Sequence, residues 1–162
     1  MTVKLMSAAS DQSRQQELAA MEQRINELIQ QSRILEAYMN DIMTRQVTVS
    51  KLMEEAHLAS NTIQNISYES DVESLMPIGI GVYIKTSVAP IKKLLINFDA
   101  GVAIEKSRED TLNYVESRIK EYEVAARQLE AQRQEISMRM NQLQSQINQM
   151  IQAAQQQQQQ PG

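Results

Sequence analysis

The stretch "MPIGIGVYIKTSVAPIKKLLINFDAGVAIEKS", from Met76 to Ser107, interrupts a chain that otherwise has the pattern of long helices. It holds three of the four glycines, two of the three prolines and the only phenylalanine. Apolar residues occupy most of the even positions between 76 and 84, and again between 94 and 104. A period of two with one apolar face is typical of a half-buried β-strand. The centre of this chain is therefore predicted to be β-structure.

Glycines divide this stretch into strands. Glycine within a strand pattern usually marks a turn or a bulge, so we expect reversals at Gly79–Gly81 and at Asp99–Gly101. Pro90 marks the link between the two halves. The pattern predicts two β-hairpins, roughly 75–79 with 82–87 and 92–98 with 102–106. Two uninterrupted strands that form one longer hairpin are the alternative.

The segment before the stretch has a heptad pattern, in which apolar residues recur at alternating steps of three and four. No glycine or proline occurs between Thr2 and Pro77, so nothing in the sequence interrupts a helix there. The stripe consists of Leu18, Met21, Ile25, Leu28, Ser32, Leu35, Met39, Ile42, Gln46, Val49, Met53, Ala56, Ser60 and Ile63. A helix that buries one narrow seam against a partner helix is predicted.

A second stripe of nearly equal length follows the stretch. It consists of Leu112, Val115, Ile119, Tyr122, Ala126, Leu129, Arg133, Ile136, Met140, Leu143, Ile147, Met150 and Ala154. Only Arg133 breaks it, and a long arginine stem can lie along a seam with its charge in water. Ser107 can cap this helix, and Glu109 and Asp110 suit the positive end of its dipole. Two equal helices joined by a central insert fold back most simply as an antiparallel pair.

The predicted hairpins present an energetic problem. An isolated two-stranded hairpin is marginal in water, and these have an apolar face and open edges. We expect a thin helical pair to be unable to cover that face, so that strands of other subunits cover it. The predicted assembly residues are Met76, Ile78, Ile80, Val82, Ile84, Leu94, Ile96, Phe98, Val102 and Ile104.

Composition argues against several classes of function. The net charge of −4 disfavours nucleic-acid binding, which depends on clustered Lys and Arg. Cysteine is absent and His57 is the only histidine, so no catalytic or metal site and no cofactor is predicted. The glycines at 79 and 81 lack the helix start of a phosphate loop. No apolar run reaches about 18 residues and no signal-peptide pattern is present, so a cytoplasmic protein without a membrane partner is expected.

The two glycine-containing blocks, between two long helices, resemble the alpha class of prefoldin subunits over residues 11–154. "LMPIGIGVYIK" contains the P-I/L-G-x-G pattern of that class at residues 77–81, and residues 100–106 match its G-x-G-V-A-V-E-K-like block. Asp99 departs from the small residue that is frequent there.

The resemblance implies a co-chaperone, or holdase, that works without ATP. It implies a hetero-hexamer of two alpha and four beta-class subunits, whose strands form a β-barrel hub that carries coiled-coil arms. It further implies that the distal arms hold unfolded client proteins and deliver them to a group II chaperonin. The expected fold class is thus α+β: a long antiparallel two-helix coiled coil with two central β-hairpins.

The expected client-binding residues are apolar residues near the distal ends of both helices. They are Leu18, Met21, Ile25, Leu28, Ile29, Ile136, Met138, Met140, Leu143, Ile147, Met150 and Ile151. Ile29, Met138 and Ile151 lie outside the stripes and are the better candidates for exposure. Methionine adapts to irregular surfaces, although a methionine within a stripe is more often ordinary core.

The sequence therefore predicts five segments. These are a flexible arm (1–11), a coiled-coil helix (12–66), a double hairpin (67–107), a second helix (108–154) and a disordered glutamine-rich tail (155–162). The alternative function is a structural coiled-coil adaptor, which would bind one defined partner and have no general holdase activity. A helix that binds a membrane surface is a third class, which the negative net charge disfavours.

Overall fold

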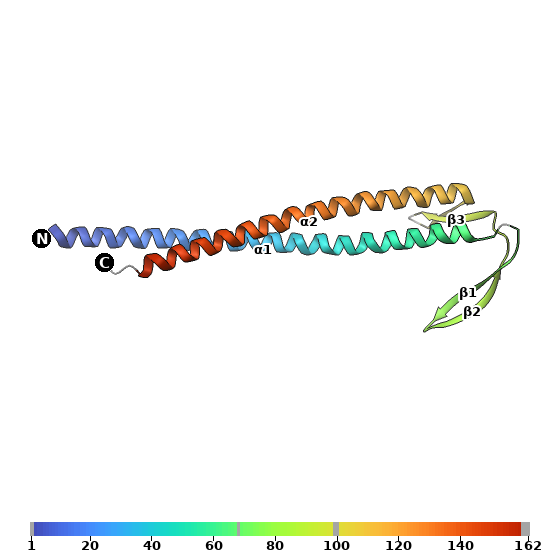
Figure 1. The fold of residues 1–162 in the computed structure, drawn as a ribbon, viewed down its shortest axis with the longest axis horizontal. Helices are drawn as coiled ribbons and strands as arrows, with labels where there is room; N and C mark the ends of the chain where they lie inside the picture. The colour runs from blue at the N-terminus through green and yellow to red at the C-terminus, as the bar shows by residue number, and fades with distance from the viewer. Residues whose placement is uncertain (1, 68, 99–100, 160–162) are drawn as a thin grey trace. The chain divides into compact units, whose positions relative to one another are not determined.

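The computed structural model describes residues 2–67, 69–98 and 101–159, with the side chains of residues 2–11 and 158–159 left aside. Along the chain, one long helix precedes four strands and a second long helix follows them, as the α+β prediction requires (Figure 1). The elements in order are α1 (Thr2–Asn65), β1 (Val72–Gly79), β2 (Val82–Val88), β3 (Lys93–Phe98), β4 (Val102–Ser107) and α2 (Arg108–Gln159).

The chain forms two compact units, and both helices contribute to each of them. The distal unit comprises Met1–Gln46 and Gln128–Gly162, and the proximal unit comprises Val47–Arg127 with all four strands. In the distal unit Gln46 of α1 reaches Glu130 of α2. In the proximal unit the side chain of Arg108, at the start of α2, donates a hydrogen bond to the carbonyl of Gln64, near the end of α1. Residue numbers thus fall along α1 as they rise along α2, and the predicted antiparallel pairing is confirmed.

The two heptad stripes form the seams of both units. All fourteen stripe positions of α1 are buried or half-buried, and Arg133 is the only exposed position in the stripe of α2. The most deeply buried apolar side chains of the seams are Leu28, Ile42, Leu129 and Ile147 in the distal unit and Ile63 and Ile119 in the proximal unit. Because the stripe is narrow, the remaining helix surface stays in water.

Both helices extend beyond the ends that the heptad pattern predicts. α1 already begins at Thr2, within the segment 1–11 expected to be a flexible arm, and α2 continues to Gln159, within the expected tail 155–162. No glycine or proline occurs in residues 2–11 or 155–159, and glutamine is a good helix former. Residues 1 and 160–162 lie outside the described residues.

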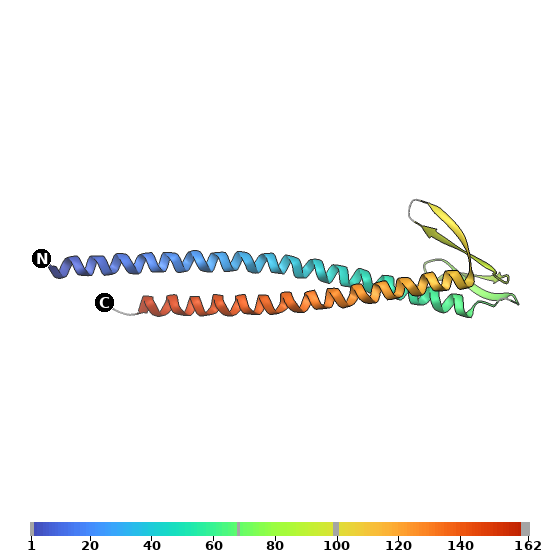
Figure 2. The same cartoon turned by 90° about the horizontal axis from the view of Figure 1, so that it is seen from above.

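Two separate antiparallel hairpins, β1–β2 and β3–β4, occupy the centre of the chain, and one longer hairpin is not formed. Figures 1 and 2 show both hairpins at the end of the proximal unit where α1 ends and α2 begins. The first turn lies at Ile80–Gly81, as predicted. In the second turn Gly101 has a positive φ of 77°, while Asp99 and Ala100 lie outside the described residues.

The predicted cap of the second helix is present. The backbone N–H of Asp110 donates to Oγ of Ser107 at 3.0 Å, which satisfies one of the free amides at the start of α2. The hydroxyl of Thr111 donates to the Ser107 carbonyl at 2.7 Å. This junction fixes where the strand β4 ends and the helix begins.

Candidate functional site

Most of the apolar side chains predicted to mediate assembly are exposed on the hairpins. Seven of the ten lie at the surface, namely Met76, Ile78, Ile80, Val82, Ile84, Val102 and Ile104. Three large apolar residues of the hairpins that the period of two did not select are exposed as well: Leu75, Tyr83 and Leu95. The exposed apolar residues of the hairpins therefore differ from the predicted set, although the two sets are equal in number.

The strand register places apolar side chains on both faces of the β1–β2 hairpin. Met76 pairs with Ile84, and Pro77 pairs with Tyr83. Directly paired residues share a face, and neighbouring pairs point to opposite faces. One face therefore carries Met76 and Ile84, and the other carries Tyr83. Ile78 lies at an irregularity of the register between Pro77 and Gly79.

The tip of the β1–β2 hairpin holds an isoleucine in an unusual backbone conformation. Ile80 has a φ of 44° and its side chain is completely exposed. Gly81 follows with a φ of 77°. Two consecutive positive φ angles are those of the type I′ turn, which favours Asn, Asp or Gly, whereas a β-branched residue there is strained. The turn thus displays an apolar side chain at a position that local backbone energetics disfavour.

The β3–β4 hairpin differs because part of it packs against the chain's own helices. Ile96 is buried, and Leu94 and Phe98 are half-buried. The Phe98 ring meets the ring of Tyr114 on α2 edge to face, with 5.8 Å between centroids. The expectation that the helices leave the apolar face uncovered is therefore wrong for β3, because its apolar side chains reach the first turns of α2. Val102 and Ile104 of β4 remain exposed.

In the distal unit, most of the predicted client-binding residues belong to the seam. Leu28 and Ile147 are buried, and eight others are half-buried: Leu18, Met21, Ile25, Ile29, Ile136, Met140, Leu143 and Met150. Met138 and Ile151 are exposed. The expectation of a well-exposed side chain is met for these two and is not met for Ile29. Ile34, Tyr38 and Met43 of α1 are further exposed apolar residues that the sequence pattern did not select.

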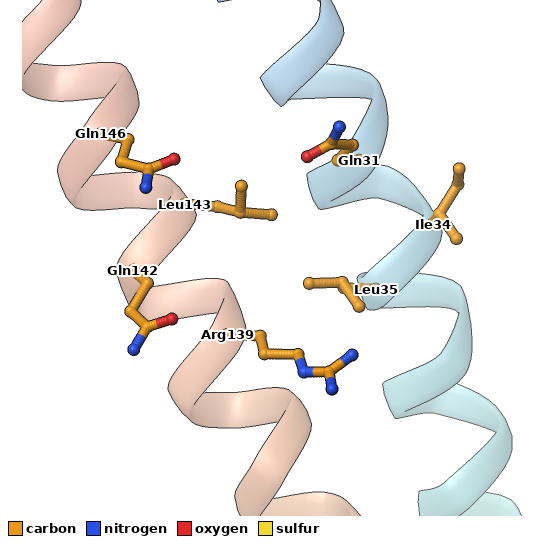
Figure 3. A pocket seen from close by; sticks show the side chains of 7 residues that line it. All are labelled: Gln31, Ile34, Leu35, Arg139, Gln142, Leu143 and Gln146. Carbon is orange, nitrogen blue, oxygen red and sulfur yellow. The ribbon is translucent and has the colours of Figure 1, made fainter.

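A cavity of about 330 Å³ opens between the helices of the distal unit. Figure 3 shows Leu35 of α1 and Leu143 of α2 pointing toward one another across it. The other lining residues are Gln31, Ile34, Arg139, Gln142 and Gln146. An apolar floor with a polar border is the general character of sites that bind uncharged organic groups.

A polar layer crosses the seam of the distal unit where both stripes are interrupted. Gln46 donates to Oε2 of Glu130 at 3.1 Å, and Arg133 holds the same carboxylate through two hydrogen bonds of 3.0 Å each. Gln134 donates to Glu130 as well. The Arg133 guanidinium, followed by the Gln134 amide, lowers the pKa of Glu130 to about 2. A polar residue within a heptad stripe fixes the register of paired helices, because sliding would leave it without partners.

Comparison with known proteins agrees with this architecture. The model of the family described as "Prefoldin subunit" matches residues 35–160. The "Prefoldin subunit alpha" of Nitrosopumilus maritimus is 36% identical over 140 residues, which cover 86% of this chain and 97% of that protein. The chain belongs to the prefoldin family, alpha class. A prefoldin subunit alpha of Methanoculleus marisnigri is 30% identical over 138 residues, covering 80% of this chain and 87% of the relative.

The fold of a solved prefoldin corresponds to the fold of this chain. A filamentous PFD from Methanocaldococcus jannaschii, solved by cryo-EM, superposes with a TM-score of 0.57 at 17% identity. The match covers 70% of this chain and 94% of the chain of that structure. This match shows that two long helices joined by small antiparallel hairpins are an architecture found in prefoldins.

Prefoldins are chaperones that assemble from several prefoldin subunits, and an exposed apolar hairpin suits a chain of this family.

Within the described ranges no group of three or more His, Asp or Glu side chains could hold a metal ion. His57 is exposed on α1. In the part of the chain that the structure describes, neither helix has an apolar run that would span a lipid bilayer.

Proposed function

We propose that this chain is the alpha-class subunit of a hetero-hexameric prefoldin that holds unfolded proteins without ATP and delivers them to a group II chaperonin. Two such chains assemble with four beta-class subunits through the hairpins of the proximal unit. The distal unit binds the client. The complex works in the cytoplasm and takes no cofactor.

The observation that carries the assembly part of the proposal is the exposed apolar surface of the β1–β2 hairpin. All residues of β1 except Val72 are exposed, although Met76 and Ile78 are large and apolar. A two-stranded sheet of this kind is marginal in water, and each of its strands has one unpaired edge that can accept a further strand. Strands from sister subunits would satisfy both requirements at once.

Apolar surface in the distal unit supports the client-binding part. Ile34, Tyr38, Met138 and Ile151 are exposed there on both helices, and a cavity separates the helices between Leu35 and Leu143. Exposed apolar residues on a protein that belongs to a chaperone family are suited to contact the apolar segments that an unfolded protein presents. Because Met138 has a flexible thioether, it can adapt to clients of different shape.

A truncation tests the client-binding part. We expect that removal of the whole distal unit, residues 1–46 and 128–162, from the chain, coexpressed with a beta-class subunit, leaves the hexamer intact and abolishes suppression of aggregation of a denatured client. Assembly is measured by size-exclusion chromatography with light scattering, and aggregation by turbidity without nucleotide. The untruncated complex is the control. A truncated hexamer with full activity would contradict the assignment of client binding to the distal ends.

A pair of matched substitutions tests the assembly part. Val82 on β2 and Val124 on α2 are 48% and 46% exposed, so replacing either by Asp buries no charge within the chain itself. We expect Val82→Asp to give monomers or loose dimers, because a charge would be placed inside the proposed hub, whereas Val124→Asp assembles normally. Normal assembly of both variants would refute the hub.

The structural adaptor is the second candidate function, and the same experiments separate it from the holdase. An adaptor assembles through the hairpins but has no effect on the turbidity of denatured clients. The exposed apolar residues of the distal unit favour the holdase, because an adaptor that binds one defined partner has no need of a surface adaptable to many.

A further inference from the structure

Two adjoining cavities form one groove along a side of the distal unit. The first, of about 330 Å³, is the cavity between Leu35 and Leu143. The second, of about 490 Å³, shares Leu35 and Arg139 with it. Together they extend from Gln31 to Arg45 on α1 and from residue 132 to residue 146 on α2. We call this surface the lateral groove.

The floor of the lateral groove is apolar. Leu35, Ile136 and Leu143 are stripe residues that are only half-buried, so part of each side chain faces the groove. Ile34 and Tyr38 on α1 line it as well and are exposed. An apolar side chain of a bound segment would gain free energy here by leaving water.

Three glutamines border the first cavity of the groove, and their amides have free hydrogen-bonding capacity. Gln31, Gln142 and Gln146 all line it, and each is exposed. Among the described residues none forms a hydrogen bond with these three amides, although other glutamines of the unit, such as Gln46 and Gln134, are bonded. A side-chain amide offers both donors and an acceptor. The border therefore matches the alternating N–H and C=O groups of a polypeptide main chain.

The charges along the groove neutralise one another in pairs. Arg45 lies 3.0 Å from Asp41 on α1, and Arg139 lies 2.6 Å from Glu135 on α2. All four side chains line the second cavity. With two positive and two negative groups already paired, the groove offers no net attraction to a charged ligand. It is complementary to an occupant without charge.

The length of the groove indicates how much chain it can hold. The fourteen residue steps from Gln31 to Arg45 span about 21 Å along a helix, which corresponds to about six residues of extended polypeptide. A helical segment would already satisfy its own main-chain groups, and the glutamine border would have nothing to bind. An extended segment leaves its N–H and C=O groups open to the glutamines.

We propose that the lateral groove binds an extended, uncharged and partly apolar segment of about six residues, with Gln31, Gln142 and Gln146 bonding its main chain and Leu35 and Leu143 contacting its side chains. The proposal rests on the proposed holdase function and assigns it a chemical class of ligand. Recognition of the main chain explains how one site accepts segments of unrelated sequence, because every polypeptide presents the same amide groups.

The test compares the full-length chain with two triple variants. Gln31→Ala/Gln142→Ala/Gln146→Ala removes the border, and Gln30→Ala/Gln144→Ala/Gln149→Ala makes the same change of composition at exposed residues of the same helices outside the cavity lining. Alanine is the best helix former, so both variants keep their helices. Circular dichroism at 222 nm and thermal unfolding confirm this before binding is measured.

The probe is an acetylated and amidated hexapeptide of alternating leucine and serine that carries a fluorophore, and its binding is followed by fluorescence anisotropy. One neutral hydrogen bond contributes roughly a factor of 2 to 12 in affinity, so loss of three weakens binding by about tenfold or more. We expect this loss for the border variant and no loss for the control variant. The same peptide with alternate main-chain nitrogens methylated should bind the unmodified chain about as weakly as the parent peptide binds the border variant.

Two outcomes would overturn the proposal: equal affinity of both triple variants for the peptide, or full affinity of the methylated peptide. An amphipathic helical peptide that binds more tightly than the extended one would overturn it as well. Aggregation suppression is measured in parallel on the hexamers formed from each chain. If the unmodified hexamer suppresses aggregation while the border variant binds the peptide normally, only the groove is refuted. If the unmodified hexamer suppresses nothing, the proposed function fails.

Discussion

Two isoleucines of α1 test whether burial in the seam is the source of the chain's stability. Ile42 lies in the stripe and is 5% exposed, whereas Ile34 lies eight residues away on the same helix and is 56% exposed. Both are replaced by alanine. The substitution is chemically identical at the two positions, so any difference in stability reports how far each side chain is removed from water.

The expected magnitudes follow from burial. Replacing Ile by Ala deletes three carbons, and at about 0.8 kcal/mol per buried methylene this costs about 2.4 kcal/mol when burial is complete. Because alanine is the better helix former, its higher helix propensity offsets roughly 0.4 kcal/mol of this loss of stability. For Ile42→Ala a residual cavity adds to the loss, so we expect about 2–3 kcal/mol. Ile34 is a little less than half buried, and Ile34→Ala should cost about 0.7 kcal/mol or less.

The measurement is urea unfolding followed by circular dichroism at 222 nm. All samples have the same protein concentration, since assembly makes apparent stability concentration-dependent. Equal slopes of the unfolding free energy against urea show that the variants expose the same surface. Equal losses at the two positions would refute the seam as the source of stability. Ile34→Ala should in addition weaken binding of the leucine–serine hexapeptide, because Ile34 lines the lateral groove.

Three further predictions concern single residues. Ile80→Asn should stabilise the β1–β2 hairpin by about 1–2 kcal/mol in thermal unfolding, because it relieves a β-branched residue at φ 44°; a loss of stability would show that the Ile80 side chain makes contacts outweighing the strain. Ser107→Ala should cost about 1 kcal/mol in urea unfolding through loss of the cap at 3.0 Å, and an unchanged midpoint would refute the cap. The pKa of Glu130 is lowered from 4.5 to about 2 in the folded chain, so its stabilising contribution is complete above pH 4.5 and is lost as the pH falls through 2. The excess stability of the unmodified chain over Glu130→Gln should shrink over that range, and a constant difference would contradict the role of the ionised carboxylate.

The helices and strands could be predicted from the sequence because their patterns are local. A heptad stripe needs only the spacing of apolar residues, and every position from Leu18 to Ile63 in the first stripe is at least half-buried. The two reversals could be located because Gly79, Gly81 and Gly101 permit positive φ angles. The helix ends were less accessible, since neither glycine nor proline marks the two ends of α1 or the start of α2.

The packing of β3 could not be predicted, because it depends on residues distant in the sequence. Strand alternation indicates that Ile96 shares an apolar face with Phe98, but it does not indicate that this face meets Tyr114 on α2. The same alternation assigns Leu95 to the polar face, and it is nevertheless a large exposed apolar residue. In the distal unit the lateral groove has no sequence signature, because Ile34 and the bordering glutamines lie outside the heptad stripe.

The β1–β2 hairpin has a consequence for a cell that makes this chain in excess over its partners. Each surplus copy would carry this exposed apolar hairpin, and each of its two strands has one edge of unpaired main-chain groups that a neighbouring molecule can bind. Unassembled subunits of this kind are prone to degradation and to aggregation. Under the proposed assembly, a cell that produces this chain would therefore benefit from matching its synthesis closely to that of the subunits that cover this hairpin.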